Sequence, residues 1–216
     1  MSESTPVDAG KAKTTSHRIF AAMYERLSRS GSERSFMEPL RKEIIGQAWG
    51  LVLEIGAGNG LNFAFYNPLQ VERVEAIEPD SAMLRYARER LKSAQVPITL
   101  TQAPVEALPF ANETFASAVA TLVFCSVTDP LLGLSEIRRV LKPGGMLLLI
   151  EHVRAQGAIA ARLQDIVTPV TKILLGNCHW NRDTEHTVAE AGFHVQDRRD
   201  LRGALQPIIM LQARRG

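Results

Sequence analysis

The sequence is short of the features that mark several protein classes. Its 216 residues include only two cysteines, Cys125 and Cys178, which lack the spacing of a CxxC or zinc motif. No apolar run has the length of a membrane span, and residues 1–16 contain no apolar signal-peptide core. The formal net charge is +2 without a long basic run, which gives no reason to expect nucleic acid as a partner. We therefore expect a cytoplasmic protein with reduced thiols and no metal site.

What the sequence does contain is a regular alternation of apolar strands and helices. Buried strands are predicted at 51–55, 74–78, 98–102, 116–124 and 146–150, with helices or loops between them. This rhythm is typical of a doubly wound parallel sheet in an α/β domain. Two further strands, at 193–201 and 207–214, should pair antiparallel because so short a connection separates them.

The chain divides into a polar N-terminus and one folded domain. We expect residues 1–16 to be disordered because they are polar, and residues 17–216 to form the domain. Within it, residues 17–49 should carry two helices that act as a flap, while residues 50–216 form the core. Tyr24 on the first helix can face a ligand under such a flap, although a tyrosine on an apolar face is more often part of a core.

The core is organised around the segment that follows its first strand. That strand ends at Ile55, and three glycines follow at alternate positions: Gly56, Gly58 and Gly60. Glycines let the backbone turn tightly and approach a ligand, and a helix beginning at Leu61 would add unpaired N–H groups. The pattern is G-x-G-x-G instead of the dinucleotide G-x-G-x-x-G, and it lacks the lysine of a P-loop.

Two carboxylates accompany this glycine loop. Glu54 precedes the first glycine, where it would repel a pyrophosphate but suits a cation such as an amino group or a sulfonium. Glu78 follows the second strand, about where an acid that binds a ribose is expected. One acid for a cation and one for a ribose favour S-adenosylmethionine over NAD. The competing interpretation is an ordinary strand–turn–helix with incidental glycines.

Several motifs together resemble the class I S-adenosylmethionine-dependent methyltransferases over residues 50–216. The matching segments are Glu54–Gly60, Glu78-Pro79, Glu106–Phe110 and Arg139–Gly145. A closer likeness, to the alkyl-thiol S-methyltransferases of the methyltransferase-like seven group and their bacterial relatives, is carried by Asn62–Tyr66, Leu122–Val127, Glu151–Val153 and Gly176–Thr184. The chain is also similar, more broadly, to quinone-biosynthesis and phospholipid methyltransferases. The resemblance implies a Rossmann-like, doubly wound seven-strand sheet ordered 3-2-1-4-5-7-6 with the last strand antiparallel.

The resemblance also implies which residues bind the cofactor, S-adenosyl-L-methionine. Glu54 is expected at the methionine end and Glu78 at the ribose. Further contacts are expected from the glycine loop, the adjoining helix, the adenine side and the end of the fourth strand: Gly56, Ala57, Gly58, Asn59, Gly60, Pro79, Met83, Val105, Glu106, Leu122 and Cys125. Pro104 stands where many members place an aspartate for the adenine amino group, so the backbone of Val105 or Glu106 is expected there instead.

The methyl acceptor is the feature that the sequence determines least. A thiol needs a weak base at most, because its pKa of about 8.5 leaves some thiolate at neutral pH. His152, after the fifth strand, is the first candidate for that base, followed by His179 and Tyr24; a histidine bonded to backbone is the competing interpretation. The open alternatives are a small thiol or similar soft nucleophile, a phospholipid headgroup or quinone precursor, and cofactor binding without catalysis.

Lipid contact is open as well. Arg198, Arg199 and Arg202 form a small basic patch that could attract an anionic substrate or a lipid headgroup. The apolar helical region 158–175, interrupted by Pro169, could line a dry pocket or lie on a membrane surface. We expect a small-molecule substrate, while the oligomeric state cannot be read from the sequence.

Overall fold

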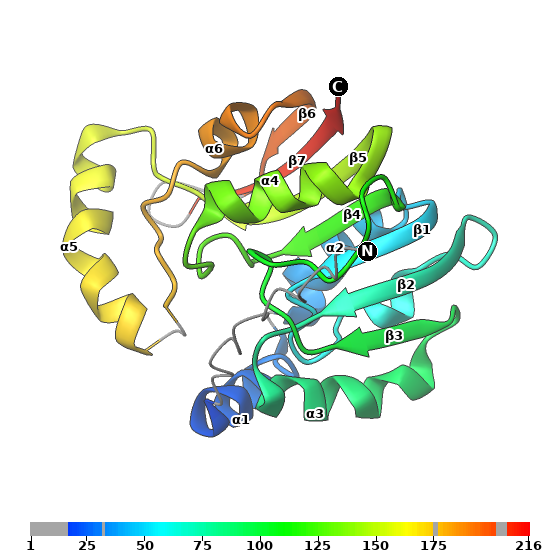
Figure 1. The fold of residues 1–216 in the computed structure, drawn as a ribbon. Helices are drawn as coiled ribbons and strands as arrows, with labels where there is room; N and C mark the ends of the chain where they lie inside the picture. The colour runs from blue at the N-terminus through cyan, green and yellow to red at the C-terminus, as the bar shows by residue number, and fades with distance from the viewer. Residues whose placement is uncertain (1–16, 32, 175–176, 202–206) are drawn as a thin grey trace, which may run out of the picture.

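A seven-strand sheet forms the centre of the protein in its computed structural model, which describes residues 17–31, 33–174, 177–201 and 207–216. The strand order is β3-β2-β1-β4-β5-β7-β6 (Figure 1). The strands are β1 (Gly50–Ile55), β2 (Val71–Ile77), β3 (Ile98–Thr101), β4 (Phe115–Thr121), β5 (Leu141–His152), β6 (Phe193–Asp200) and β7 (Ile208–Arg215). Neighbours from β3 to β5 pair in parallel, whereas β7 runs antiparallel to both β5 and β6. The predicted Rossmann-like topology is therefore confirmed.

Helices cover both faces of the sheet. The described helices are α1 (Arg18–Leu27), α2 (Glu38–Ile45), α3 (Ser81–Arg90), α4 (Pro130–Val140), α5 (Ala158–Leu174) and α6 (Thr184–Glu190). Apolar residues of α4 and α6 pack on one face of the sheet, and those of α2 and α3 pack on the other. Because β4 lies at the centre between these two layers, all of its side chains are buried.

Aspartates fix where three of these helices begin. The side chains of Asp80, Asp129 and Asp183 each accept a hydrogen bond from a backbone N–H in the first turn of α3, α4 and α6, respectively. As a consequence, α3 starts immediately beyond the carboxyl end of β2, where the ligand site is expected.

The segment after the glycine loop differs from the prediction of a regular helix starting at Leu61. It forms only a single 3-10 turn, Phe63–Phe65. Asn62 and Tyr66 both turn their side chains inward to Glu54, and Pro68 follows at once, disfavouring a helical conformation in the residue before it. The helix N-terminus that would supply free N–H groups is therefore absent here.

The ends of two central strands also differ from the sequence prediction. β4 ends at Thr121 instead of Phe124, because Leu122 adopts a left-handed backbone with φ of 59°. β5 begins at Leu141 instead of Met146, since Leu141 already pairs with Phe115. The prediction of a disordered segment at 1–16 lies outside the described residues.

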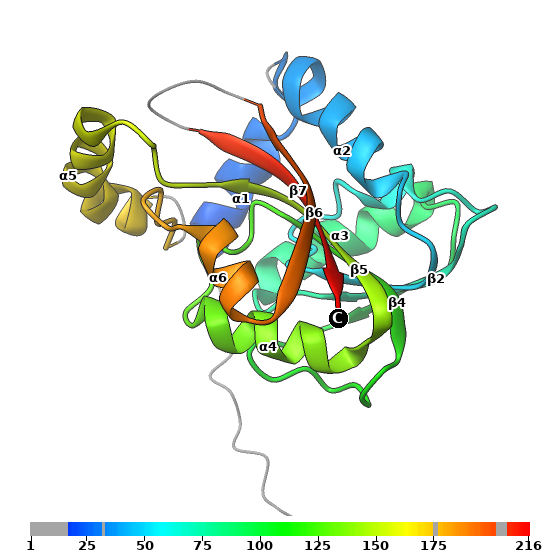
Figure 2. The same cartoon turned by 90° about the horizontal axis from the view of Figure 1, so that it is seen from above.

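The first helix packs beside the third, beyond the carboxyl ends of β1 and β2. Ala21 of α1 is buried against Ala82 and Met83 of α3, with Phe20 and Tyr24 at the margin of this cluster. Figure 2 shows α1 and α5 on the same side of the molecule as the ends of these strands. Among the helices in the described part of the chain, none has the length and apolar character needed to cross a bilayer.

Candidate cofactor and acceptor site

The three positions of the loop require glycine for different structural reasons. All three have positive φ, of 60°, 56° and 82° for Gly56, Gly58 and Gly60. A Cβ on Gly56 would lie 2.6 Å from Val123, and one on Gly60 would lie 2.7 Å from the ring of Phe63, so packing excludes a side chain at both. A Cβ on Gly58 would meet nothing closer than a backbone oxygen at 3.8 Å. Gly58 therefore faces open space, as expected of the position where a loop receives a ligand.

Glu78 lies beside this open space, immediately after β2. Its two carboxylate oxygens accept backbone N–H groups from Gly58 and from Asp80, each at 2.9 Å. Burial raises the pKa of Glu78 to about 7, against these two hydrogen bonds. Each oxygen keeps a further lone pair, so the ionised carboxylate can still accept two hydroxyl groups.

Glu54 lies deeper, beneath the loop. Its oxygens accept hydrogen bonds from the Asn62 side-chain amide at 2.9 Å and from the Tyr66 hydroxyl at 2.8 Å. Burial raises the pKa of Glu54 to about 7, and these two bonds oppose the rise. The carboxylate thus orients two side chains of the following turn, and its direct contact with a cationic ligand stays a prediction.

A buried arginine joins this network, and the sequence analysis missed it. Arg41 of α2 donates to Asn62 Oδ1 at 2.9 Å and to Thr121 Oγ1 at 2.7 Å, and pairs with Glu33 at 2.8 Å. A signal was available, because Arg41 lies on the buried face of its helix together with Ile44 and Ile45. A charge on such a face needs partners, and Arg41 finds them in Glu33, Asn62 and Thr121.

The first helix reaches the glycine loop through a third buried carboxylate. Glu25 of α1 accepts from the Asn59 side-chain amide at 2.7 Å and from Arg90 of α3 at 2.7 Å. Arg90 also donates to the Asn59 backbone oxygen at 2.8 Å. Tyr24, the residue before Glu25, is half-buried, and burial raises its pKa while Arg41 opposes the rise. These contacts hold α1 over the loop; its use as a movable flap stays a prediction.

The adenine-side candidates are engaged in packing and capping. Val105 is buried against α4, where a Cβ on Gly133 would lie 2.9 Å from it. One oxygen of Glu106 accepts from the backbone N–H groups of Thr128 and Asp129 at 3.1 and 3.2 Å. Only the second Glu106 oxygen is thus left for another donor, and an adenine contact by either residue stays a prediction.

The remaining cofactor candidates lie around Glu78. Ala57 donates its backbone N–H to the Ile77 oxygen at 2.9 Å, which ties the loop to β2. Met83 is buried under α1, and Pro79 is exposed with its oxygen bonded to Gln102 at 3.0 Å. The structure therefore gathers all of these residues at one edge of the sheet, with α1 lying over Met83.

On the other side of the site, a fully buried glutamate holds the turn that ends β4. One oxygen of Glu151 accepts the backbone N–H groups of Val123 and Phe124 at 2.7 and 2.9 Å. Burial raises the pKa of Glu151 to about 7, against these bonds. The left-handed conformation of Leu122 directs the backbone into this turn. Glu151 was noticed in the sequence only as part of a family motif.

The carbonyl groups of the same turn are held by residues 177–182. The Arg182 guanidinium donates to the oxygens of Phe124 and Val127 at 2.5 and 2.6 Å. The backbone N–H of His179 donates to the Cys125 oxygen at 2.7 Å, and Asn177 donates to the Ser126 oxygen at 3.0 Å. The motif Gly176–Thr184 therefore contributes an arginine clamp that sequence reasoning did not identify.

The side chains expected near the methyl acceptor lie around this turn. Cys125 and Cys178 are free and buried, and the interaction of the two thiols together with burial raises the pKa of Cys125. The ring of His152 lies 6.2 Å from that of Trp180. Burial, Arg182 and Lys172 lower the pKa of His179, which keeps its imidazole neutral near pH 7.

The basic patch expected near the C-terminus is neutralised by ion pairs. Arg198 bonds to Glu185 at 2.6 Å and to Asp200 at 2.7 Å, and Arg199 bonds to Glu43 at 2.7 Å. Arg202 lies outside the described residues. The two described arginines thus offer no free charge to an anionic substrate.

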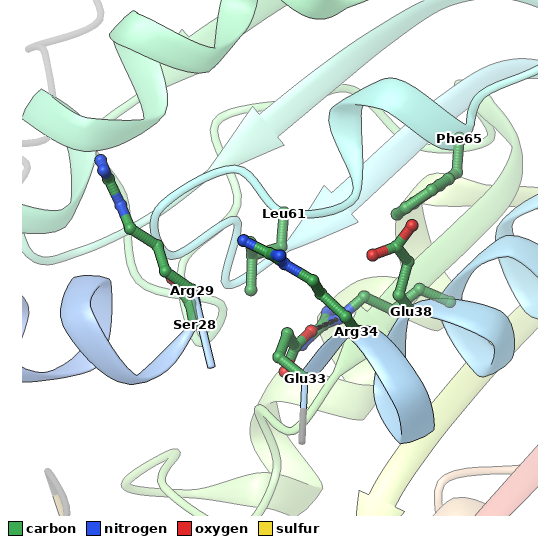
Figure 3. Close-up of a pocket in the computed structure, with 8 residues that line it drawn as sticks. Ser28, Arg29, Glu33, Arg34, Glu38, Leu61 and Phe65 are labelled. Carbon is green, nitrogen blue, oxygen red and sulfur yellow. Dashed lines mark hydrogen bonds and ion pairs between the residues drawn. The ribbon is translucent and has the colours of Figure 1, made fainter. Parts of the chain in front are cut away.

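A separate small pocket lies beside the glycine loop, with a volume of about 190 Å³. Figure 3 shows Arg34 and Glu38 projecting from one helical segment toward Leu61 and Phe65. Pockets for a nucleoside-sized ligand are usually larger than about 300 Å³, and this one mixes arginines with glutamates. We therefore assign no ligand to it.

Comparison with known proteins finds relatives among the methyltransferases. The model of a family described as "Methyltransferase domain" matches residues 53–149. Thiol S-methyltransferase TMT1B of Rattus norvegicus is 31% identical over 169 residues, covering 73% of this chain and 68% of that protein. The ubiquinone/menaquinone biosynthesis C-methyltransferase UbiE of Syntrophotalea carbinolica is 32% identical over 143 residues, covering 65% and 60%.

Solved structures show the same fold at low sequence identity. Geranyl diphosphate C-methyltransferase from Streptomyces coelicolor A3(2), solved with S-adenosyl-L-homocysteine, superposes with a TM-score of 0.66. The two sequences are 15% identical, and the match covers 83% of this chain and 75% of that one. This likeness concerns the fold alone.

Proposed function

Since the chain belongs to the class I S-adenosylmethionine-dependent methyltransferases, we propose that it methylates a small thiol or a similar soft nucleophile. The 31% identity with a thiol S-methyltransferase over most of the chain carries this choice of acceptor. The turn 122–127 supports it, because His179, whose pKa is lowered, lies against this turn and is suited to take a thiol proton. We further propose a cytoplasmic location, which suits reduced cysteines.

In this proposal the glycine loop and Glu78 hold the cofactor. Glu78 accepts the two ribose hydroxyls with its remaining lone pairs, and the open side of Gly58 receives the cofactor. Glu54 acts at the methionine end through Asn62. Leu122 and Cys125 border the sulfonium, which supplies an activated methyl group.

The chain's own contribution is mainly to align the acceptor and to exclude water. The rate of in-line methyl transfer gains most when the acceptor atom and the methyl carbon are held about 3–3.5 Å apart. The fixed turn 122–127 provides one rigid wall for this purpose, and Tyr24 on α1 can cover the opening. His152 and His179 are the candidate bases that take the thiol proton, and neutral imidazole suits this role.

The test is a panel of small thiols, amines, phenols and phosphatidylethanolamine, assayed by release of S-adenosylhomocysteine. We expect turnover with thiols at a rate that rises with pH as thiolate accumulates. Gly58→Val, designed to block the cofactor, serves as the inactive control. Turnover of an amine or a lipid, with none for any thiol, would reject the thiol acceptor.

The second candidate is a ring-carbon acceptor. It is favoured by the 32% identity with UbiE, although this match covers less of both chains. A quinone-precursor phenol in the same panel tests it directly. A chain that binds the cofactor tightly but turns over no acceptor in the panel would instead support a non-catalytic role.

A further inference from the structure

Helix α5 has its polar side facing the protein and its apolar side facing outward. Gln164 is buried, accepting from the Ala155 backbone N–H at 2.7 Å and donating to the Val153 oxygen at 3.2 Å. Thr171 is likewise buried and donates to the Cys178 oxygen at 2.8 Å. The opposite side carries a row of exposed apolar side chains: Ile159, Leu163, Ile166 and Val170, with Ile159 80% and Ile166 72% exposed. This order is the reverse of an ordinary surface helix.

Helix α1 carries a second exposed apolar row at the same edge of the protein. Ile19, Met23 and Leu27 follow one another at intervals of one helical turn, and Ile19 is 89% exposed. The inner side of α1 is occupied instead by Ala21 and Glu25. Figure 1 places α1 and α5 on either side of the edge to which the parallel strands point. The two helices that carry these rows therefore flank the edge of the sheet at which the candidate site lies.

The uncompensated charges on these two helices are all positive. Their acidic residues are both paired, Glu25 with Arg90 and Asp165 with Arg154. The other charged residues have no acidic partner in the described part of the chain: Arg18, Arg26, Arg162 and Lys172. Apolar rows flanked by free basic groups are typical of helices that lie in the interface of an anionic bilayer.

We propose that α1 and α5 dock together on an anionic lipid surface, with the opening of the site turned toward it. The apolar rows would enter the acyl boundary, and the four basic side chains would meet phosphate groups. A second copy of the chain fits the same face less well, because it would bring like charges together. The proposal does not depend on the identity of the methyl acceptor.

The experiment is cosedimentation of the full chain with vesicles of phosphatidylglycerol or of phosphatidylcholine. We expect binding to the anionic vesicles only, weakened by high salt. Ile166→Glu places a charge in the apolar row and should lower the partition coefficient at least tenfold. Leu69→Glu is its matched control, since Leu69 is 92% exposed in the turn before β2, at the opposite edge.

A second pair of variants tests the electrostatic part. Arg162→Glu should weaken binding to phosphatidylglycerol vesicles several-fold, whereas Lys142→Glu, exposed at the start of β5, should not. Unchanged S-adenosylhomocysteine affinity in each variant shows that its fold is intact. Equal partition into both vesicle types, equal effects of Leu69→Glu and Ile166→Glu, or a dimer in sedimentation velocity that Ile166→Glu dissociates would each overturn the proposal.

Discussion

The cofactor side and the acceptor side of the site are held together in different ways. Beneath the glycine loop, buried side chains bond mainly to other side chains, as in the network that joins Arg41, Asn62 and Glu54. Around the turn 122–127, side chains bond instead to backbone, since Glu151 accepts its N–H groups and Arg182 donates to its carbonyls. The first arrangement requires particular residues at each position, whereas the second fixes the path of a loop whatever its side chains are.

This difference offers a reason why relatives with one cofactor act on different acceptors. A network of paired side chains tolerates few substitutions, because each loss leaves a buried polar group without its partner. A backbone clamp leaves the side chains of the turn free to change. The following predictions test this contrast in order of expected effect.

The largest effect is expected at Gly58. Gly58→Val puts a branched side chain into the open space of the loop and should weaken cofactor binding more than about a hundredfold. Gly144→Val is the control, because Gly144 also has a positive φ and open surroundings but lies in β5 far from the loop. Both variants share the backbone strain. Calorimetry showing equal losses in both would mean that strain, and not the cofactor's space, explains the result.

The next effect concerns stability on the cofactor side. Arg41→Ala leaves Glu33, Asn62 and Thr121 without their buried partner and should lower the free energy of unfolding by about 3 kcal/mol. Arg199→Ala removes the ion pair between Arg199 and Glu43. This pair is about as short as that between Arg41 and Glu33, but both of its side chains are half-exposed. The substitution should therefore cost less than about 1 kcal/mol. Similar urea midpoints for the two variants would contradict the importance of the buried network.

The fold and the glycine loop illustrate what could be predicted from the sequence. The strand order, the positions of β1 to β3 and the glycine loop follow from local patterns or from the family resemblance. The glycine loop was recognised from the sequence, because glycines at alternate positions between a strand and a turn have few other uses. Glu78 was likewise placed correctly at the end of β2.

What the sequence did not show are contacts between distant segments. Arg41 meets Thr121 across 80 positions, and Arg182 meets Phe124 across 58. A single sequence carries no signal for such pairs beyond a charge in an apolar row. The helix expected after Gly60 failed for a related reason, since Asn62 and Tyr66 serve a buried carboxylate instead of continuing a helix.

A smaller and more selective effect is expected on the acceptor side. Arg182→Gln weakens the clamp on Phe124 and Val127 and should lower kcat/KM for the acceptor by about tenfold, because misplaced walls reduce alignment. The dissociation constant of S-adenosylhomocysteine should stay unchanged. Arg198→Gln, which removes only surface ion pairs, is the control. A parallel loss of cofactor affinity would show that the two sides are not independent.

The last effect is the dependence of stability on pH. Burial raises the pKa of Glu54, Glu78 and Glu151 from an ordinary 4.5 to about 7. Between these pH values the folded protein keeps protons that the unfolded chain has released, so the free energy of unfolding falls as pH rises from about 5 to 7. Above pH 7 these groups ionise in both states and the decline ends.

Glu151→Gln isolates one of the three contributions. Its amide oxygen can still accept the Val123 and Phe124 N–H groups, so the turn should persist while one titration disappears. We expect the decline contributed by the three carboxyls, measured by urea unfolding of the cofactor-free protein at pH 5, 6, 7 and 8, to shrink by about one third. Exposed Glu72→Gln is the matched control and should leave the curve unchanged. If Glu151→Gln also leaves the pH dependence unchanged, the Glu151 carboxyl is ionised throughout this range. The turn would then be held by two charged groups, the Glu151 carboxylate at its N–H groups and the Arg182 guanidinium at its carbonyls.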